Sequence, residues 1–262
     1  MEFTLPETNL LNVQKVSEKD NLGIFILEPL SPGYGITVGN SLRRALLSSL
    51  EGAAIAQVKI EGVSHEFSTI PGCQEDVVDI ILNLKKLRLK SDSNEPIILK
   101  LNKKGPGKIT AADFEKNSQV EIVDQDHYLA QLDTKGKISL QATVEKGRGY
   151  IPIEDRKTEK LPLGTIAMDA IFSPVKKVHY TNENTRVGGK TNFDKLTMEI
   201  TTDGSITPTA ALVNAGKILS EHFGLVTELE KEVAAKKAPT KAKKTVKKTP
   251  AKKKTVKKTV KK

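Results

Sequence analysis

The stretch from Leu27 to Gly52 reads LEPLSPGYGITVGNSLRRALLSSLEG and indicates more about the fold than any other part of the chain. A run of β-prone residues at 24–27 leads into it and stops at Pro29, which cannot donate a ladder hydrogen bond. A loop follows, because proline, serine and glycine cluster at 29–35. Apolar residues then recur at roughly helical spacing and predict one buried helix face: Ile36, Leu42, Ala45, Leu46 and Leu50.

Two adjacent arginines, Arg43 and Arg44, stand in the middle of this predicted helix. Neighbouring helical residues point about 100° apart, so the two side chains cannot share one direction. Arginines on an amphipathic helix commonly form its solvated flank, and that interpretation stays open on the residues alone. A paired cation this close to an apolar face also suits a surface that meets a partner.

The order of residues in this helix resembles the first helix of the α subunit of bacterial-type DNA-directed RNA polymerase. The family pattern G-x-T-x-G-N-x-L-R-R-x-L-L-S-S is present from Gly35 to Ser49. The resemblance continues in order from about Leu10 to about Phe223. Five further stretches carry it: GVSHEFSTIPGCQEDVVDIILNL (62–84), LNKKGPGKITAAD (101–113), KGRGYIP (146–152), FSPVKKV (172–178) and FDKLTMEI (193–200).

Composition and charge restrict the class of protein. The chain has 262 residues, enough for one large or two modest domains. Its net charge of +10 is uneven, because residues from Lys231 onward hold 15 lysines and one acid. Subtracting these from 42 basic and 32 acidic residues leaves 27 cations and 31 anions, so residues 1–230 carry −4. A polyanion such as nucleic acid would therefore be attracted to the C-terminal arm.

The expected compartment is the cytoplasm. The single cysteine, Cys73, excludes an internal disulfide and a multi-cysteine zinc site, which fits a reducing environment. The sequence has no apolar run long enough to span a membrane, and its N-terminus lacks a secretory pattern.

The periodicity along the rest of the chain predicts an α+β fold. Short strands are expected at 18–27, 55–60, 97–101, 120–123, 128–132, 138–144, 175–180 and 195–201. An apolar stripe predicts a helix from Gln74 to about Leu87. Thr207 and Pro208 suit the cap and the first position of a last helix that runs to Glu230.

The resemblance implies a two-domain architecture of the α-subunit N-terminal type, which periodicity could not have predicted. A discontinuous dimerisation domain would combine residues 1–51 with residues 170–230. A mainly-β domain at 52–169 would be inserted into it and would contact the large subunits. Residues 231–262 have no apolar periodicity and repeat Thr-Val-Lys-Lys, so we expect a disordered Lys-rich tail there.

An apolar stripe on the last helix needs a surface to cover it. Packing against the body of the chain would satisfy this need, and self-association would satisfy it equally well. The resemblance favours a homodimer, since this helix and the first helix form the dimer interface in the family. The residues assigned to the interface are Leu42, Leu46, Leu50, Leu212, Ala215, Leu219 and Val226.

The sequence lacks recognisable patterns for catalysis or metal binding. The four histidines are not spaced as metal ligands, and Asp124 and Asp126 form an isolated pair of the kind that is usually solvated. A phosphate-binding glycine loop and a nucleophile elbow are also missing. We therefore expect no cofactor, no metal and no catalytic residue on this chain, which would be an enzyme only as a subunit of the polymerase.

The resemblance implies that one copy of the dimer recruits the β subunit and the other recruits β′, which carry the catalysis, while ω and sigma complete the holoenzyme. Arg44 is assigned to β, because a guanidinium can bind a carboxylate with two hydrogen bonds. Arg43, Arg148, Lys176 and Arg186 are further candidates for contacts with β or β′. Arg148 stands between two glycines, which also suits a tight turn at a strand end.

Most members of the family continue into a compact helical domain that binds upstream promoter DNA, and a lysine arm stands here instead. We expect the arm to bind DNA of the nucleoid without sequence preference and with strong salt dependence. The alternatives are a solvated tail or one that binds RNA or acidic proteins. The alternative function is a free-standing basic-tailed DNA-compaction protein. The residues assigned to DNA are Lys243, Lys244, Lys247, Lys248, Lys252 and Lys253.

Overall fold

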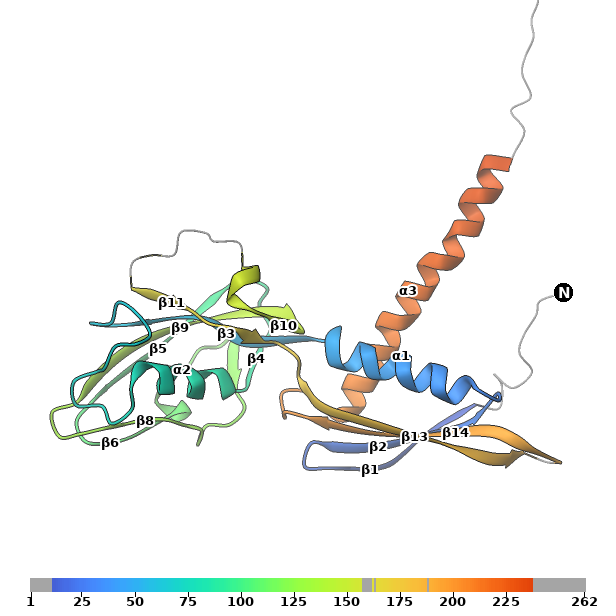
Figure 1. The fold of residues 1–262 in the computed structure, drawn as a ribbon, viewed down its shortest axis with the longest axis horizontal. Coiled ribbons are helices and arrows are strands. Elements are labelled where there is room, and N and C mark those ends of the chain that lie inside the picture. The colour runs from blue at the N-terminus through green and yellow to red at the C-terminus, as the bar shows by residue number, and fades with distance from the viewer. Residues whose placement is uncertain (1–10, 157–161, 163, 188, 238–262) are drawn as a thin grey trace, which may run out of the picture. The chain divides into compact units, whose positions relative to one another are not determined.

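The computed structural model describes residues 11–156, 162, 164–187 and 189–237, and its fold is α+β (Figure 1). Within these residues, three α-helices accompany a larger number of strands. Contacts divide the chain into two units between His222 and Phe223. The first unit contains two large hydrophobic cores, each beside its own sheet.

The first sheet has four antiparallel strands in the order β1-β2-β14-β13, which span Asn12–Lys19, Leu22–Leu30, Lys190–Thr202 and Val175–Val187. The prediction of a single strand at 18–27 is wrong, because Asp20 and Asn21 adopt positive φ angles and reverse the chain between β1 and β2. Short polar side chains tolerate this conformation, so the Asp-Asn pair makes a hairpin turn.

Helix α1 (Tyr34–Ser48) and the start of helix α3 (Pro208–Lys237) share one core with this sheet. Alternate residues of β2 and β14 point into that core, as the period of two in a strand requires. The buried members include Phe25, Leu27, Leu42, Leu46, Leu196, Met198, Ile200, Ala211 and Ala215.

The second sheet has the strand order β5-β9-β3-β4-β7, with β11 also paired to β3 (Figure 1). Its strands span Ile97–Lys104, Lys137–Arg148, Glu51–Ile60, Leu89–Ser91, Val120–Ile122 and, for β11, Thr165–Ala167. Two further pairs join β6 (Gly107–Thr110) to β8 (Tyr128–Leu132) and β10 (Tyr150–Ile151) to β12 (Ala170–Ile171). Short 3-10 helices cover Ala111–Asp113 and Ile153–Asp155.

Helix α2 (Val77–Lys86) shares the core of this second sheet. Asp76 caps the helix, since its carboxylate accepts a hydrogen bond from the Asp79 amide at 2.8 Å. The predicted apolar stripe is confirmed, because Val77, Ile80 and Leu84 are buried. The predicted strands from 55–60 to 195–201 are also confirmed, although several are longer than their periodicity indicated.

Helix α3 starts where the sequence predicts, and the Thr207 hydroxyl accepts a hydrogen bond from the Ala210 amide at 3.3 Å. Its predicted end at Glu230 is wrong, since the helix continues to Lys237. The tail that we expected to be disordered from Lys231 is therefore helical over its first residues. Alanine and lysine favour a helix there, and Pro239 disfavours its continuation.

The two cores draw on different parts of the chain. The core beside the first sheet uses residues from 25–50 and 175–215, whereas the other uses residues from 55–168. This pattern is compatible with an insertion at 52–169. The boundaries of the discontinuous domain stay a prediction, because residues up to His222 form one contact unit.

A buried carboxylate holds the start of α1. Gly33 precedes this helix without a capping side chain, and Asp194 of β14, only 4% exposed, accepts a hydrogen bond from the Gly35 amide at 2.9 Å.

We expect Asp194→Ala to lower the free energy of unfolding by about 2 kcal/mol, because the amide loses its acceptor. Asp194→Asn keeps an acceptor and should lose less. Urea denaturation at one protein concentration compares the two variants, and equal losses would contradict this role.

Candidate subunit-docking surface

Two glycines let α1 lie close to β13 and β14. A Cβ atom at Gly39 would stand 2.8 Å from the Tyr180 ring and 2.9 Å from the Leu196 side chain. A Cβ atom at Gly35 would stand 2.0 Å from the amide oxygen of Asn182. A side chain at either position would displace residues of β13 or β14, so this face of α1 lies against the sheet and the opposite face is turned to solvent.

The solvent face of α1 carries both predicted arginines. Arg43 and Arg44 are exposed, and neither guanidinium has a hydrogen-bond or ion-pair partner within the part of the chain that the structure describes. Ile36, 59% exposed, and Leu47, 36% exposed, share the side of Arg43, because helical residues four and seven apart lie on one face. The prediction that Ile36 is buried is therefore wrong, since Gly35 and Gly39 occupy the covered face. Guanidinium groups beside exposed aliphatic side chains suit a protein partner.

Arg148 lies near the C-terminal end of α1 but already has a partner. It ends β9 opposite Glu51, the first residue of β3, and its Nη2 atom stands 2.5 Å from the Glu51 carboxylate. Lys146 stands 3.5 Å from the other oxygen of the same carboxylate. The hydrogen bond from Arg148 lowers the pKa of Glu51 below its ordinary value. A partner subunit would meet an ion pair here rather than an isolated cation.

The structure separates Lys176 from Arg186, although both belong to β13 and both are exposed. Lys176 is near the start of the strand, beside the segment where the Phe172 amide donates a hydrogen bond to the Gly149 carbonyl. Arg186 is ten residues further along, or roughly 33 Å at the rise of an extended strand. Arg148 therefore lies near the C-terminal end of α1, Lys176 lies near the start of β13, and Arg186 is at the far end of that strand.

The residues assigned to the dimer interface differ in exposure, and their role in a dimer stays a prediction. Leu42, Leu46, Leu50 and Ala215 are at most 8% exposed in a single chain, because they fill the core beneath α1 and α3. Their own chain therefore covers them, and an apolar stripe alone does not indicate which surface covers it. Of the other assigned residues, Leu212 and Leu219 are partly buried on this core, whereas Val226 is 62% exposed. Sequence reasoning missed Phe223, which is 63% exposed.

Comparisons with known proteins identify the family. Residues 58–173 match the family model described as the RNA polymerase Rpb3/RpoA insert domain. The DNA-directed RNA polymerase subunit alpha of Symbiobacterium thermophilum is 52% identical over 217 residues, which cover 83% of this chain and 69% of that protein. The chain belongs to the α-subunit family of DNA-directed RNA polymerase.

Two further α subunits agree with this assignment. The protein from Alkaliphilus metalliredigens is 49% identical over 224 residues, which cover 86% of this chain and 71% of that protein. The protein from Moorella thermoacetica is 52% identical over 215 residues, which cover 82% of this chain and 69% of that protein. The resemblance inferred from the motifs is confirmed, and the interpretation as a free-standing DNA-compaction protein is not favoured.

An exposed apolar surface of this α subunit escaped the sequence analysis. Phe67, Leu82 and Ile153 are 80%, 47% and 45% exposed, and they line a hollow of about 220 Å³ beside α2. An ion pair between Lys85 and Asp169, at 2.7 Å, also borders the hollow. Leu82 falls outside the buried stripe of α2, and this was the signal that could have identified the surface.

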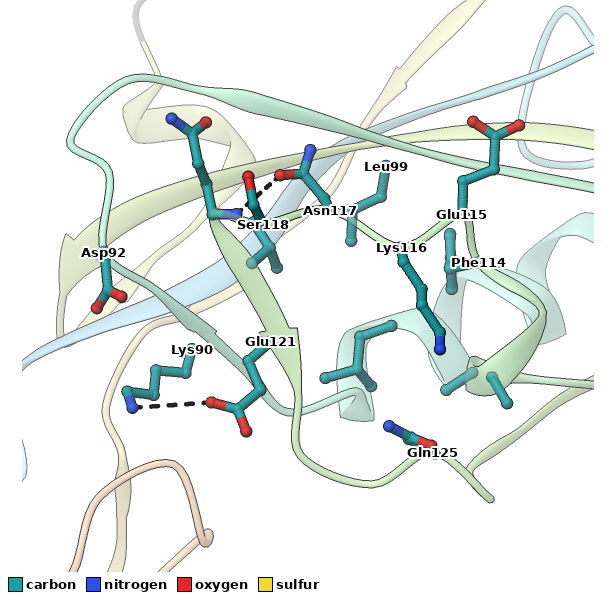
Figure 2. A pocket seen from close by; sticks show the side chains of 15 residues that line it. Lys90, Asp92, Leu99, Phe114, Glu115, Lys116, Asn117, Ser118, Glu121 and Gln125 are labelled. Carbon is teal, nitrogen blue, oxygen red and sulfur yellow. Dashed lines mark hydrogen bonds and ion pairs between the residues drawn. The ribbon is translucent and has the colours of Figure 1, made fainter.

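A second hollow, of about 500 Å³, is lined by β7, by part of β4 and by the loop after the first 3-10 helix. Figure 2 shows Lys90 and Glu121 paired at its edge, 3.7 Å apart, with Lys116 and Gln125 on another side. Its lining among the described residues contains neither histidine nor cysteine, and its charges do not converge on one point. We assign no function to this hollow.

The tail residues assigned to DNA all lie outside the described residues, so their role stays a prediction: Lys243, Lys244, Lys247, Lys248, Lys252 and Lys253.

Over the described ranges, no group of three or more His, Cys, Asp or Glu side chains is placed to hold a metal ion. Among those same residues, no helix has the length and the apolar content to cross a membrane.

Glu75 of the Gln-Glu-Asp motif ties the loop before α2 to β8. Its carboxylate accepts hydrogen bonds from the Tyr128 hydroxyl and, at 2.7 Å, from the Gln131 amide. Burial raises the pKa of Glu75, but these hydrogen bonds outweigh it and hold the pKa below the ordinary value of 4.5. Burial and the bond to Glu75 raise the pKa of Tyr128 to about 12.

These two pKa shifts predict a loss of stability at both ends of the pH scale. Glu75, with a lowered pKa, stabilises the fold above pH 4.5, and this contribution is lost as the pH falls through the folded-state pKa. Tyr128, with a raised pKa, stabilises the fold below pH 10, and this contribution is lost as the pH rises toward 12. Tyr128→Phe should therefore lose less stability at alkaline pH than the unchanged protein. Glu75→Gln should lose less stability at acidic pH. Unfolding midpoints measured across pH test both, and two profiles like that of the unchanged protein would refute the assignment.

Proposed function

We propose that this chain homodimerises and serves as the platform on which the β and β′ subunits of RNA polymerase assemble, and that it supplies no catalytic residue itself. The observation that carries the proposal is the solvent face of α1. Arg43 and Arg44 stand there beside exposed Ile36 and Leu47, and both guanidinium groups are unpaired within the described chain. An apolar surface with unpaired guanidinium groups is stabilised when a protein partner covers it.

The dimer forms through α3 in this proposal. Leu212, Leu219, Phe223 and Val226 fall on one helical stripe, since they are separated by seven, four and three residues. The first two are partly buried on the core of their own chain, whereas Phe223 and Val226 are exposed. A second copy of the stripe, related by a two-fold axis, would cover the exposed pair. The discontinuous domain at 1–51 and 170–230 would be the dimerisation domain, and residues 52–169 the insertion.

The large subunits bind the solvent face of α1 with Arg43 and Arg44, and they also contact Arg148 and Lys176. Arg44 binds β, because its exposed guanidinium is free to make two hydrogen bonds to a carboxylate. The apolar surface of Phe67, Leu82 and Ile153 extends the area that a large partner can cover. A two-fold dimer presents each of these surfaces twice, so one copy is available to β and the other to β′. Arg186 belongs to a separate contact, and ω and sigma join the assembled enzyme.

The experiment that tests this function is co-purification. The full chain, tagged and produced in cells with β and β′, should capture both large subunits, and mass spectrometry would identify them. A chain that captures neither subunit but retains bulk DNA would refute the platform and favour the DNA-compaction protein. We place the assembly in the cytoplasm at the nucleoid, where the Lys-rich tail adds a sequence-independent contact with DNA.

A further inference from the structure

The strand register of the second sheet gathers lysines on its solvent face. On β5, buried Leu99 and Leu101 alternate with exposed Lys100 and Asn102, so the lysine lies on the face away from the core. The register sets Lys100 opposite Gln141 of β9, and Gln141 opposite Lys59 of β3. Lys100 and Lys59 are therefore two strands apart in one row, at about 10 Å between their Cα atoms.

A second row lies nearer the end of β5. Lys104 pairs directly with Lys137 of β9, and both side chains are exposed. Two like charges on opposite positions of an antiparallel pair destabilise the pairing. We define Lys59, Lys100, Lys104 and Lys137 as the lysine face, which lies on β3, β5 and β9 in Figure 1.

Few acids neutralise this face. Glu61 stands 3.9 Å from Lys137, Glu145 is paired with Arg156 at 3.4 Å, and Glu115 accepts a hydrogen bond from Asn102. Lys59, Lys100 and Lys104 have no ion-pair partner among the described residues. The face is thus a positive area on a body whose residues 1–230 carry a net charge of −4.

The chemistry of the face distinguishes between kinds of partner. Protein interfaces are rich in aromatic residues, methionine and arginine and poor in lysine. The neighbours of the four lysines are instead Gln57, Asn102, Ser139, Gln141 and Thr143, with Ile98 at the margin. An aromatic ring, on which a single-stranded base would stack, is missing from these described positions. Lysine and neutral polar side chains on a sheet suit the phosphate backbone of a duplex.

We propose that the lysine face binds the phosphodiester backbone of double-stranded DNA, without reading its sequence. DNA is the polyanion on which the polymerase family acts, so the inference goes beyond the platform function and does not need the dimer or the large-subunit contacts. Each lysine contributes a point charge, and binding releases counterions from the duplex. The contact is separate from any contact made by the Lys-rich tail.

The test uses the full chain, so that the tail is present in every sample. The face variant combines Lys59→Gln, Lys100→Gln and Lys104→Gln. The control variant combines Lys19→Gln, Lys86→Gln and Lys217→Gln, which removes the same charge from exposed positions on β1, α2 and α3, outside the strands of the face. Affinity for a DNA duplex of about 30 base pairs is measured between about 50 and 200 mM salt.

We expect the face variant to bind roughly tenfold more weakly at the lowest salt, and the slope of log affinity against log salt to fall by about 3. The control variant should match the unchanged chain. Equal losses of DNA affinity in the two variants would show that only the total charge matters. No loss of affinity in either variant would show that other residues bind the DNA. Both results overturn the proposal. Unchanged DNA affinity together with lost capture of β or β′ would assign the face to a protein instead. Failure of the co-purification in unchanged protein would refute the platform and leave this assay unaffected.

Discussion

Arg44→Ala is expected to abolish the capture of β while the α dimer stays intact. The Arg44 side chain is exposed on α1 and has no hydrogen-bond or ion-pair partner among the described residues, so its removal should not unfold the chain. Truncating one partner of a buried, hydrogen-bonded charge pair costs about 2–5 kcal/mol. The affinity for β should therefore fall by well over tenfold. Sedimentation measures the dimer, and co-purification measures the complex.

Two further variants sharpen this test. Arg44→Lys keeps the charge but loses the planar group that binds a carboxylate with two hydrogen bonds, so it should recover only part of the affinity. The control Lys135→Ala removes an exposed cation from the turn between β8 and β9, at the end of β9 opposite Arg148, and should assemble normally. Normal assembly of Arg44→Ala would show that this residue does not contact β.

The double variant Phe223→Asp with Val226→Asp is expected to convert the dimer into a monomer. The two apolar side chains are 63% and 62% exposed, and they lie three residues apart on one side of α3. Covering one such side chain contributes about 1.5–3 kcal/mol, and a two-fold interface covers four of them. Their loss should weaken dimerisation by more than roughly 10⁴-fold. Sedimentation over a range of protein concentrations measures the change.

The matched control is Lys217→Asp, which places the same residue on the opposite side of the same helix and should leave the dimer unchanged. Since Phe223 and Val226 are exposed in a single chain, the core around Ala211 and Ala215 should keep its stability in the double variant. A double variant that remains a dimer would exclude this stripe of α3 from the interface.

Local patterns predicted the helices and the middles of most strands. The capping residue Thr207 and the stripe of Val77, Ile80 and Leu84 depend on neighbours a few residues away, so the sequence contains what is needed. The start of α2 was predicted three residues early, at Gln74, because the cap at Asp76 was not recognised. The turn at Asp20 and Asn21 was missed, because residues tolerating positive φ do not require it. The ends of the longer strands were also missed, since the length of a strand depends on partners far along the chain.

The candidate site was predictable only in part. The motif of α1 identified Arg43 and Arg44, and both prove to be exposed. Periodicity assigned Ile36 to the buried face, and the structure corrects this assignment. The resemblance assigned Leu42, Leu46 and Leu50 to the dimer interface; they are buried in a single chain, and their part in a dimer stays a prediction. A stripe of apolar residues indicates that a surface is covered. It does not tell whether the same chain or another chain covers it, because both remove the same area from water.

The sequence by itself determined the family, the three helices, the paired arginines and the opposite charges of body and tail. These features are either local in the chain or independent of folding. Only the tertiary structure decided that Gly35 and Gly39 turn the arginines outward, that Asp194 holds the start of α1, and that Lys59, Lys100, Lys104 and Lys137 share one face. The reason is physical: each of these arrangements joins residues that are distant in sequence, and the register and packing that bring them together form only when the whole chain has folded.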